Sequence, residues 1–242
     1  MTELEISIRE RVATFVLNRP DKANALNASL VEALHEALDQ ALDGSLKLLV
    51  LRGAGRNFCA GFDFSGFETS SIAELAWRFI RIEQLLQRLA HAPCATMTLA
   101  QGACFGAGAD LVVACGTRMA TPDARFRMPG WRFGLALGTR RLARRICDAA
   151  ALRMLEGATV LDASAAAKVG LIDEICTPET WDAQTSAAQS RAESLDDVAG
   201  QGLRKILTPD TRAVDMSSLI ESLTNGDLKA RITMFRQPSQ VL

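Results

Sequence analysis

The stretch GACFGAGADL, from Gly102 to Leu111, places three glycines and three alanines around one carboxylate, Asp110. Glycine and alanine let backbones approach closely but bury little side-chain surface. The apolar run ATMTLAQ (95–101) precedes the stretch and LVVAC (111–115) ends it, which predicts a tight turn between a buried strand and a helix. Two explanations fit so many small residues: close packing of the helix on the strand, or exposure of backbone amides.

Toward the amino terminus, the apolar pattern changes between a period of two and helical spacing. The segments LEISIRE (4–10) and RVATFVLNRP (11–20) predict a hairpin that turns at 9–11, with Pro20 ending its second strand. Leucines at 30, 34, 38 and 42 predict a helix before Gly44, which is a candidate C-cap. KLLVLRG (47–53) then has the composition of a buried strand.

The same alternation continues through the glycine-rich stretch. We expect a helix over Ile72–Ala90, a strand at 95–102, a short helix from about Gly106 and a strand near RMATPD (118–123). Such alternation favours parallel βαβ units and therefore an α/β fold. From Thr139 onward the pattern is mostly helical, apart from LIDEIC (171–176). We expect an α/β core over residues 1–190 and a helical region over 191–242 that packs on, or between, copies of the core.

Composition excludes several classes of partner. The chain has 242 residues, of which 48% are hydrophobic and 23% charged, enough to build a substantial core. Its net charge of −1 gives no overall field that would attract nucleic acid or an anionic membrane, so any anion site must be local. The opening MTELEISIRE has no apolar run of the kind found in secretory signals.

Residues 89–109 contain no Asp, Glu, Lys or Arg over a length that suffices to cross a bilayer. Pro93, Gln101 and three glycines weaken this alternative, because small and polar residues gain little on transfer into lipid. A buried strand followed by a buried helix is the better prediction for this segment. We therefore expect no contact with a membrane.

The cysteines and histidines do not form a metal-site pattern. The six cysteines have no C-x-x-C spacing, and His35 and His91 lie far apart. Unpatterned cysteines suit a reducing cytosol, so we expect a cytoplasmic protein without a bound metal. Cys59 and Cys104 lie in glycine-containing turns but have no predicted histidine partner, which disfavours a thiolate nucleophile.

A second glycine-containing turn, NFCAGFDF at Asn57–Phe64, also follows a predicted strand. The turn at 101–111 precedes a helix, so its amides would point outward at a helix N-terminus, where negative charge is stabilised. An oxyanion site needs this arrangement. The alternative for each glycine is close packing between helix and strand.

With these turns, the sequence resembles the crotonase family of enoyl-CoA hydratases and isomerases over nearly the whole chain. The matching segments occur in family order: NRPDKANALN (18–27), FCAGFDF (58–64), QGACFGAGADL (101–111), FRMPG (126–130) and ASAAAKVGLIDEI (163–175). The resemblance implies the ClpP/crotonase fold of repeated ββα units. It also implies a homotrimer or a dimer of trimers, with 191–242 as the trimerisation region.

The resemblance further implies an acyl-CoA substrate whose thioester carbonyl lies between the backbone amides of Phe62 and Ala107. Coenzyme A would be part of the substrate, so no separate cofactor is expected. The implied contacts with the coenzyme are Lys22, Ala23, Ala25, Ala60, Phe64 and Gly106. Taken without the resemblance, Lys22 has the character of a solvated surface charge.

Asp110 matches the first of two catalytic glutamates in a typical hydratase of this family. A carboxylate there can move a proton to or from the carbon skeleton, whereas the alternative is an aspartate that stabilises the positive end of the helix dipole. The second glutamate would fall at Gly130, which cannot activate water. The chain also lacks the family's longer PGxGGT turn downstream, so we expect the pocket wall to differ there.

Arginine is concentrated between residues 125 and 153, where eight arginines stand against one acid, Asp148. Guanidinium groups pair well with phosphates, so the cluster is a candidate for the coenzyme's phosphates. A solvated helix face or a subunit contact is the alternative.

These observations favour an enzyme that stabilises an enolate and moves one proton, with isomerisation mechanistically easier than hydration. Acyl-CoA decarboxylation or thioester hydrolysis stays open, as does a catalytically silent homologue that binds an acyl-CoA. The acyl group depends on pocket walls drawn from segments such as Phe67–Phe79 and Trp131–Leu137, which the fold alone does not specify.

Overall fold

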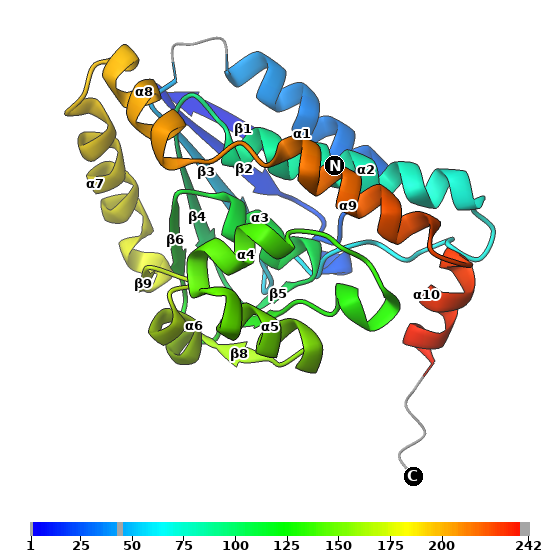
Figure 1. The fold of residues 1–242 in the computed structure, drawn as a ribbon. Helices are drawn as coiled ribbons and strands as arrows, with labels where there is room; N and C mark the ends of the chain where they lie inside the picture. Colours follow the sequence, from blue (N-terminus) through cyan, green and yellow to red (C-terminus); the bar gives the residue numbers. More distant parts are fainter. Residues whose placement is uncertain (1, 43–45, 238–242) are drawn as a thin grey trace.

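The computed structural model describes residues 2–42 and 46–237 (Figure 1). Its main sheet has six strands in the order β1-β2-β3-β4-β6-β9. The predicted hairpin is confirmed: β1 (Leu4–Arg9) pairs antiparallel with β2 (Val12–Leu17). β2 ends three residues before Pro20, and β1 lies at the sheet edge with five of its six residues exposed.

The remaining strands of the main sheet are parallel, as the alternation of strands and helices predicts. They are β3 (Leu48–Gly53), β4 (Ala95–Ala100), β6 (Thr117–Ala120) and β9 (Glu174–Ile175). β3 and β4 are almost wholly buried, because helices cover both faces of a parallel sheet. The α/β class is therefore confirmed.

Three helices carry the large core on one face of this sheet. They are α1 (Ala28–Ala41), α2 (Ile72–Ala90) and α3 (Ala107–Ala114), and α2 has the predicted bounds. Ser71 and Glu74 form a capping box at its start, satisfying amides that a helix N-terminus leaves free. The proposed C-cap at Gly44 lies outside the described residues.

The opposite face of the sheet is covered by a helix that follows β9 in the sequence. This helix, α7 (Trp181–Glu193), buries Trp181 and Ala188 against apolar side chains of β3, β4 and β6. In Figure 1, α7 lies on one side of the sheet while α1 and α2 lie on the other. The sheet is therefore a central layer, and the ends of its parallel strands are shielded by the loops that form the site.

A small second sheet is absent from the sequence prediction. It consists of β5 (Ala103–Phe105), β7 (Arg125–Arg127) and β8 (Leu161–Asp162). Strands of two or three residues are too short to show a period of two. The sheet places the glycine-rich stretch beside the FRMPG segment, because Cys104 pairs with Phe126.

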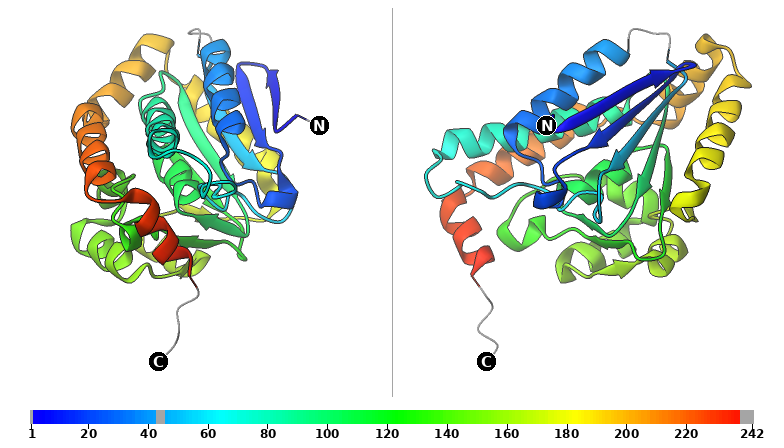
Figure 2. Two further views of the ribbon diagram at one scale, coloured as in Figure 1. Left: turned by 90° about the vertical axis from the view of Figure 1, so that its right-hand side faces the viewer. Right: turned by 180° about the vertical axis from the view of Figure 1, so that it is seen from behind.

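Helices dominate after Thr139, as predicted. They include α4 (Thr139–Ile146), α5 (Asp148–Gly157), α6 (Ala163–Val169), α8 (Asp197–Leu207), α9 (Arg212–Thr224) and α10 (Leu228–Arg236), with short 3-10 turns at Pro20–Lys22 (η1), Gly130–Phe133 (η2) and Pro178–Thr180 (η3). α9 packs along α2, and α10 packs on η2. The red α10 and orange α9 in Figure 2 thus cover the same chain's core.

The uncharged segment 89–109 forms the end of α2, then β4 and β5, and then the start of α3. The expected buried strand and buried helix are both present, since β4 is buried except at Ala95 and every residue of α3 is buried. Across the described ranges, 2–42 and 46–237, no helix combines the length and apolar character needed to span a bilayer.

Candidate active site

The two glycine-containing turns pack directly against each other. The Cys59 amide donates to the Ala103 carbonyl, and the Phe105 amide donates to the Cys59 carbonyl, each at 3.0 Å. A Cβ atom built on Gly108 would overlap the Cys59 carbonyl, and one built on Gly61 would overlap the Phe105 carbonyl. Close packing therefore explains Gly61 and Gly108, which confirms one of the two explanations for the small residues.

The same contacts leave the amides of Phe62 and Ala107 without a hydrogen-bond acceptor among the described residues. Leu26 and Phe62 form an isolated β-bridge, in which the Leu26 amide donates to the Gly61 carbonyl and the Leu26 carbonyl accepts from the Asp63 amide. The Phe62 amide therefore points away from Leu26. Ala107 is the first residue of α3, where the helix offers no acceptor for an N–H. Among the hydrogen bonds of residues 2–42 and 46–237, neither amide appears as a donor. A Cβ on Gly61 would lie 3.3 Å from the Ala107 nitrogen, so the two turns meet at this point.

Both amides belong to residues that line an apolar cavity of about 70 Å³. Six of the nine predicted site residues line it: Ala60, Phe62, Phe64, Gly106, Ala107 and Asp110. The rest of the lining is apolar or glycine: Phe79, Phe105, Met128, Pro129, Gly130, Trp131, Phe133, Leu135, Leu137, Leu155 and Phe235. Packing thus gathers residues from six separate parts of the sequence into one site.

Aromatic side chains dominate one side of this cavity. The Phe62 ring stacks on Phe79 with a centroid distance of 4.2 Å, and Phe133 lies 5.0 Å from Phe235. Phe235 comes from α10, which Arg231 ties to the Phe133 and Gly134 carbonyls. The carboxyl-terminal helix therefore closes the cavity of its own chain, a contribution that no sequence motif indicates.

Asp110 is the one carboxylate among the described residues that line the cavity. Its side chain is almost fully buried, and Oδ1 has no hydrogen-bond partner within the described chain. Burial raises the pKa of Asp110 to about 7; the Arg141 cation lowers it and the Glu83 carboxylate raises it further. Near neutral pH this group can therefore both accept and release a proton.

A buried ion pair lies close enough to influence Asp110. Arg141 of α4 contacts both carboxylate oxygens of Glu83 of α2, at 2.9 and 2.5 Å, and contacts Asp215 of α9 at 3.5 Å. Glu83 is engaged by this pair and lines a separate polar pocket of about 760 Å³ rather than the apolar cavity. Two features of the sequence relate to this site, an acid on an apolar helix and a cluster of arginines, but no sequence pattern indicates that they lie together.

Gly138 makes room for the Asp110 carboxyl group. A Cβ atom built on Gly138 would overlap Oδ1 of Asp110, and the backbone φ of Gly138 is +64°. Residues with a side chain rarely adopt this left-handed backbone conformation. Glycine therefore meets two requirements at position 138: it adopts the positive φ, and it leaves space for the Asp110 carboxyl group. The segment Leu135–Thr139, which stands where the family has its longer turn, thus supplies direct contact with Asp110.

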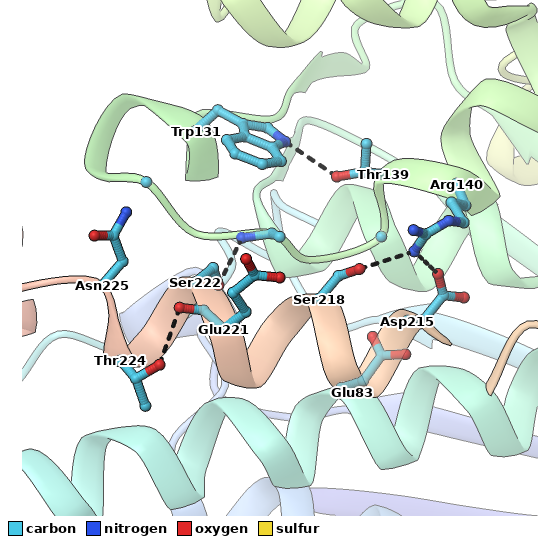
Figure 3. Close-up of a pocket in the computed structure, with 13 residues that line it drawn as sticks. Glu83, Trp131, Thr139, Arg140, Asp215, Ser218, Glu221, Ser222, Thr224 and Asn225 are labelled. Atoms are coloured by element: carbon cyan, nitrogen blue, oxygen red, sulfur yellow. Dashed lines mark hydrogen bonds and ion pairs between the residues drawn. The ribbon is translucent and has the colours of Figure 1, made fainter. Parts of the chain in front are cut away.

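The polar pocket lies on the far side of this segment (Figure 3). Trp131 donates to Thr139 at 3.0 Å, and Arg140 contacts Asp215 and Ser218 at 2.9 and 3.2 Å. Figure 3 shows Glu83 beneath, rising from α2 toward α9. The two cavities therefore differ in the chemistry of their linings, and the segment 133–138 contributes residues to both.

The raised pKa of Asp110 predicts a pH-dependent stability. The pKa of Asp110 is near 7 in the folded chain and near 3.8 in the unfolded chain, so the folded chain binds this proton more tightly. The stabilisation that proton binding gives the folded state is therefore lost as pH rises from about 4 through 7. We expect the free energy of unfolding of Asp110→Asn, relative to that of the parent, to increase by about 3–4 kcal/mol between pH 4 and pH 8. Urea unfolding at both pH values measures this; an equal difference at both would contradict the burial of the charge.

The predicted coenzyme-binding turn packs beside the cavity. The Ala60 amide donates to the Ala23 carbonyl at 2.9 Å, and Arg19 contacts the Ala25 carbonyl and Asp63. Lys22 is exposed on this turn. Lys22, Ala23 and Ala25 are not among the residues that line the cavity, although the turn that carries them contacts residues that do.

Asn24 holds this turn from inside and was missed at the sequence level. Its side-chain amide donates to the Ala54 and Asn57 carbonyls at 2.9 and 2.7 Å, and its oxygen accepts from the Arg19 amide. Ala23 and Asn24 both have positive φ, at 48° and 55°. The asparagine itself is the sequence signal for this turn, because Asn tolerates a positive φ and its side chain hydrogen-bonds to nearby backbone groups.

The eight clustered arginines separate in three dimensions. Arg141 pairs with Glu83, Arg140 pairs with Asp215, and Arg145 donates to the Val113 and Cys115 carbonyls at the end of α3. Arg127 donates to the Ala158 carbonyl and Arg144 to the Leu207 carbonyl. Arg125 donates to the Ala124 carbonyl, so contacts within the chain account for six of the eight.

The remaining candidates have structural surroundings. Burial raises the pKa of Cys59 to about 12 and that of Cys104 well above its usual value, so neither thiol forms a thiolate near neutral pH. His35 is buried on α1 against the Arg81 carbonyl, and His91 caps the end of α2.

Gly130 lies in the cavity wall and leaves it without a second carboxylate. A Cβ atom there would lie 3.1 Å from the Leu135 carbonyl oxygen and 3.8 Å from the Leu135 Cβ. Since the neighbouring backbone would need to shift only by a few tenths of an ångström, the position admits a side chain with local adjustment.

Comparisons with known proteins identify the family of this chain. The family model described as enoyl-CoA hydratase/isomerase matches residues 7–225. "Probable enoyl-CoA hydratase echA6" of Mycobacterium bovis is 36% identical over 208 residues, which are 85% of this chain and 82% of that protein. "Ethylmalonyl-CoA decarboxylase" of Mus musculus is 30% identical over 76% of this chain and 58% of its own length.

Solved structures extend the agreement to the fold. A crystal structure of a protein placed among the enoyl-CoA hydratases/isomerases, from Bordetella parapertussis, superposes with a TM-score of 0.96 at 44% identity and covers 98% of this chain and 100% of that chain. The ClpP/crotonase fold implied by the sequence is thereby confirmed. The chain belongs to the enoyl-CoA hydratase/isomerase family of the crotonase superfamily.

Proposed function

We propose that this enzyme acts on an acyl-CoA thioester by holding an enolate oxygen between the amides of Phe62 and Ala107. The observation that carries the proposal is the pair of free amides at one end of an apolar cavity that also contains Asp110. Preorganised donors in a site shielded from water stabilise developing charge, and one such donor contributes about 3 kcal/mol to barrier lowering. The family membership supports the thioester as substrate.

In this proposal Asp110 is the proton shuttle. It removes a proton from the carbon next to the thioester carbonyl. The electron pair of that C–H bond forms a double bond to the carbonyl carbon, and the π electrons of the carbonyl move onto its oxygen to give the enolate. Return of the same proton to a carbon two positions further along shifts the double bond and regenerates the carboxylate. A pKa near 7 suits both steps at neutral pH.

The absence of a second carboxylate favours this isomerisation over hydration. Hydration needs one group to activate water and another to deliver a proton, and Gly130 supplies neither. Glu83 does not fill the role in this proposal, because both its oxygens contact Arg141 and it lies outside the apolar cavity.

The coenzyme is proposed to bind along the turn at 19–26. Ala60, Phe64 and Gly106 line the cavity and would contact the pantetheine arm. Ala23 and Ala25 lie on the adjoining turn, where the Ala23 carbonyl accepts from the Ala60 amide. Lys22, exposed on the same turn, is available for the adenine nucleotide. Coenzyme A enters as part of the substrate, and no separate cofactor is part of the proposal.

A turnover screen tests the reaction. The enzyme is incubated with 2-enoyl-, 3-enoyl- and malonyl-type CoA thioesters, and the products are identified by mass spectrometry. Conversion of 3-enoyl to 2-enoyl thioester supports the proposal. Loss of carbon dioxide from the malonyl type would favour a decarboxylase, an alternative that the relative from Mus musculus keeps in view. Binding of all thioesters without conversion would identify a catalytically silent homologue.

Substitution of Gly138 gives a specific prediction for the site. Gly138→Ala places a methyl group where Oδ1 of Asp110 lies, so we expect at least about tenfold lower turnover at unchanged coenzyme affinity. Gly226→Ala is the matched control: Gly226 also has a positive φ, of +75°, but no atom within 4 Å of its built Cβ. Both variants bear the same conformational cost of about 1–2 kcal/mol. Equal turnover in the two would show that Asp110 tolerates displacement.

Assembly into a trimer or a dimer of trimers is also proposed. α8 supports it with apolar side chains exposed to solvent, among them Val198 at 83% and Ile206 at 81%. We expect sedimentation at micromolar concentration to give a trimer or a hexamer. Val198→Asp with Ile206→Asp should shift this species toward the monomer, whereas a stable monomer of the parent would overturn the proposal.

A cytoplasmic location completes the proposal. All six cysteines lie within the described residues, and none forms a disulfide. Free thiols of this number suit a reducing compartment.

A further inference from the structure

The cavity that contains Asp110 is bounded by a wall one residue thick. Along the segment 133–138, which runs from the end of η2 to the start of α4, alternate residues line different spaces. Phe133, Leu135 and Leu137 line the apolar cavity, and Gly134, Ala136 and Gly138 line the polar pocket. The segment thus separates about 70 Å³ of apolar space from about 760 Å³ of polar space. No second layer of side chains stands between the two among these residues.

Contacts from the carboxyl-terminal helices hold this wall in place. The Ala136 amide donates to Ser222 of α9 at 3.1 Å, a contact seen in Figure 3. Arg231 of α10 donates to the Phe133 and Gly134 carbonyls at 2.9 and 3.0 Å. Leu135 in turn bonds back to the Gly130 carbonyl. Displacement of this wall by a longer ligand would break several of these hydrogen bonds to α9 and α10.

The volume of the apolar cavity limits what fits in front of the wall. A cavity of about 150 Å³ holds a benzene ring, so roughly half that volume holds about three carbon atoms. An aromatic ring or a medium-length chain therefore exceeds the space between the two amides and Leu137.

The charge of the lining limits the ligand further. Asp110 is the one ionisable group among the described residues that line the cavity. The nearest cation recorded at this aromatic wall, Arg78, lies over the Phe62 ring at 4.2 Å from its centroid, but it lines a different pocket. A carboxylate on the acyl group would enter an apolar space beside the carboxyl group of Asp110 and would find no cation to pair with. Burial of such an unpaired charge is strongly unfavourable.

We propose that the substrate is the CoA thioester of a short, uncharged acyl group of about four carbons: the thioester carbonyl carbon at the two amides and about three carbons in the cavity beyond it. The wall at Leu135 and Leu137 sets this limit. The inference rests on the proposed function for the thioester itself. It adds the substrate class and the residues that select it.

Calorimetric binding of three saturated thioesters tests the proposal, because saturated chains bind without double-bond chemistry. The probes are butyryl-CoA, octanoyl-CoA and succinyl-CoA. We expect octanoyl-CoA and succinyl-CoA to bind at least about tenfold more weakly than butyryl-CoA, since a single methylene already changes selection by about 10–200-fold in a closed apolar pocket. Equal binding of octanoyl-CoA and butyryl-CoA would overturn the length limit, and tight binding of succinyl-CoA would overturn the requirement for an uncharged group.

Variants of the wall assign the limit to named side chains. Leu137→Ala and Leu135→Ala open the apolar cavity toward the polar pocket, so the preference for butyryl-CoA over octanoyl-CoA should fall at least about tenfold. Ala136→Ser changes the other face of the same wall and should keep the parent's ratio. The ratio is taken within one preparation, so partial unfolding of a variant does not alter it.

The outcomes also separate this inference from the proposed function. If none of the thioesters binds to the parent, the proposed function fails and the substrate class fails with it. If all bind but an unchanged ratio is found in both leucine variants, the proposed function stands and the wall is not the selecting element.

Discussion

Replacement of Asp110 by Asn should lower turnover of the substrate by about 10²–10⁴-fold while the thioester affinity changes little. Asn keeps the size of the side chain but cannot accept the proton that the proposed isomerisation removes. Measurement of kcat and of the binding constant separately tests the prediction, because a residue that acts only in proton transfer lowers kcat and leaves binding intact.

A control and a pH profile make this prediction specific. Asp148→Asn removes an exposed carboxylate at the start of α5 and should leave turnover unchanged. In the parent, kcat/KM should rise with pH through about 7, as the buried acid gives up its proton and becomes a base. A flat profile, or full turnover in Asp110→Asn, would reassign Asp110 to the stability of α3.

Hydration of a crotonyl-type thioester should be about 10²–10⁴-fold below that of a site with two carboxylates. Asp110 alone must handle both water and proton, and aspartate is one methylene shorter than glutamate. Steady-state hydration assays measure the deficit. An efficiency near the diffusional ceiling of about 10⁸ M⁻¹s⁻¹ would mean that another residue replaces the missing glutamate.

The same deficit should be partly reversible at Gly130. Gly130→Glu adds a carboxylate at the cavity wall and should raise hydration relative to isomerisation, while Gly130→Gln has the same size without the base. Both variants must move the Leu135 carbonyl, which lies 3.1 Å from the new Cβ, so the comparison between them removes this effect. Equal hydration by the two would show that water does not reach this position.

Function and stability oppose each other at Asp110. The burial that brings its pKa to about 7 also makes its charged form costly in the folded chain. The Arg141 cation offsets part of this cost, and Glu83 keeps Arg141 neutralised within the core. An Asp110→Asn chain that is more stable at pH 8 and almost inactive would be the expected signature of a catalytic carboxylate.

Local sequence patterns determined most of the architecture. The helix at Ile72–Ala90, the hairpin before Pro20 and the parallel order of the later strands follow from periodicity, caps and turn residues, which act within a few residues of one another. The two glycine-containing motifs, at 58–64 and 101–111, also contain the six predicted site residues that line one cavity. Short strands such as β5 and β8 escaped prediction because two or three residues carry no period.

Tertiary structure alone decided how the site is completed. Arg141 and Glu83 are 58 residues apart, and Phe235 reaches the cavity from the far end of the chain. The close approach of Gly138 to Asp110 and the alternating lining of the wall at 133–138 likewise depend on contacts with α3, α9 and α10. A sequence pattern reports which face of an element is apolar, whereas these contacts depend on which distant element packs there, and that is fixed only when the whole core closes.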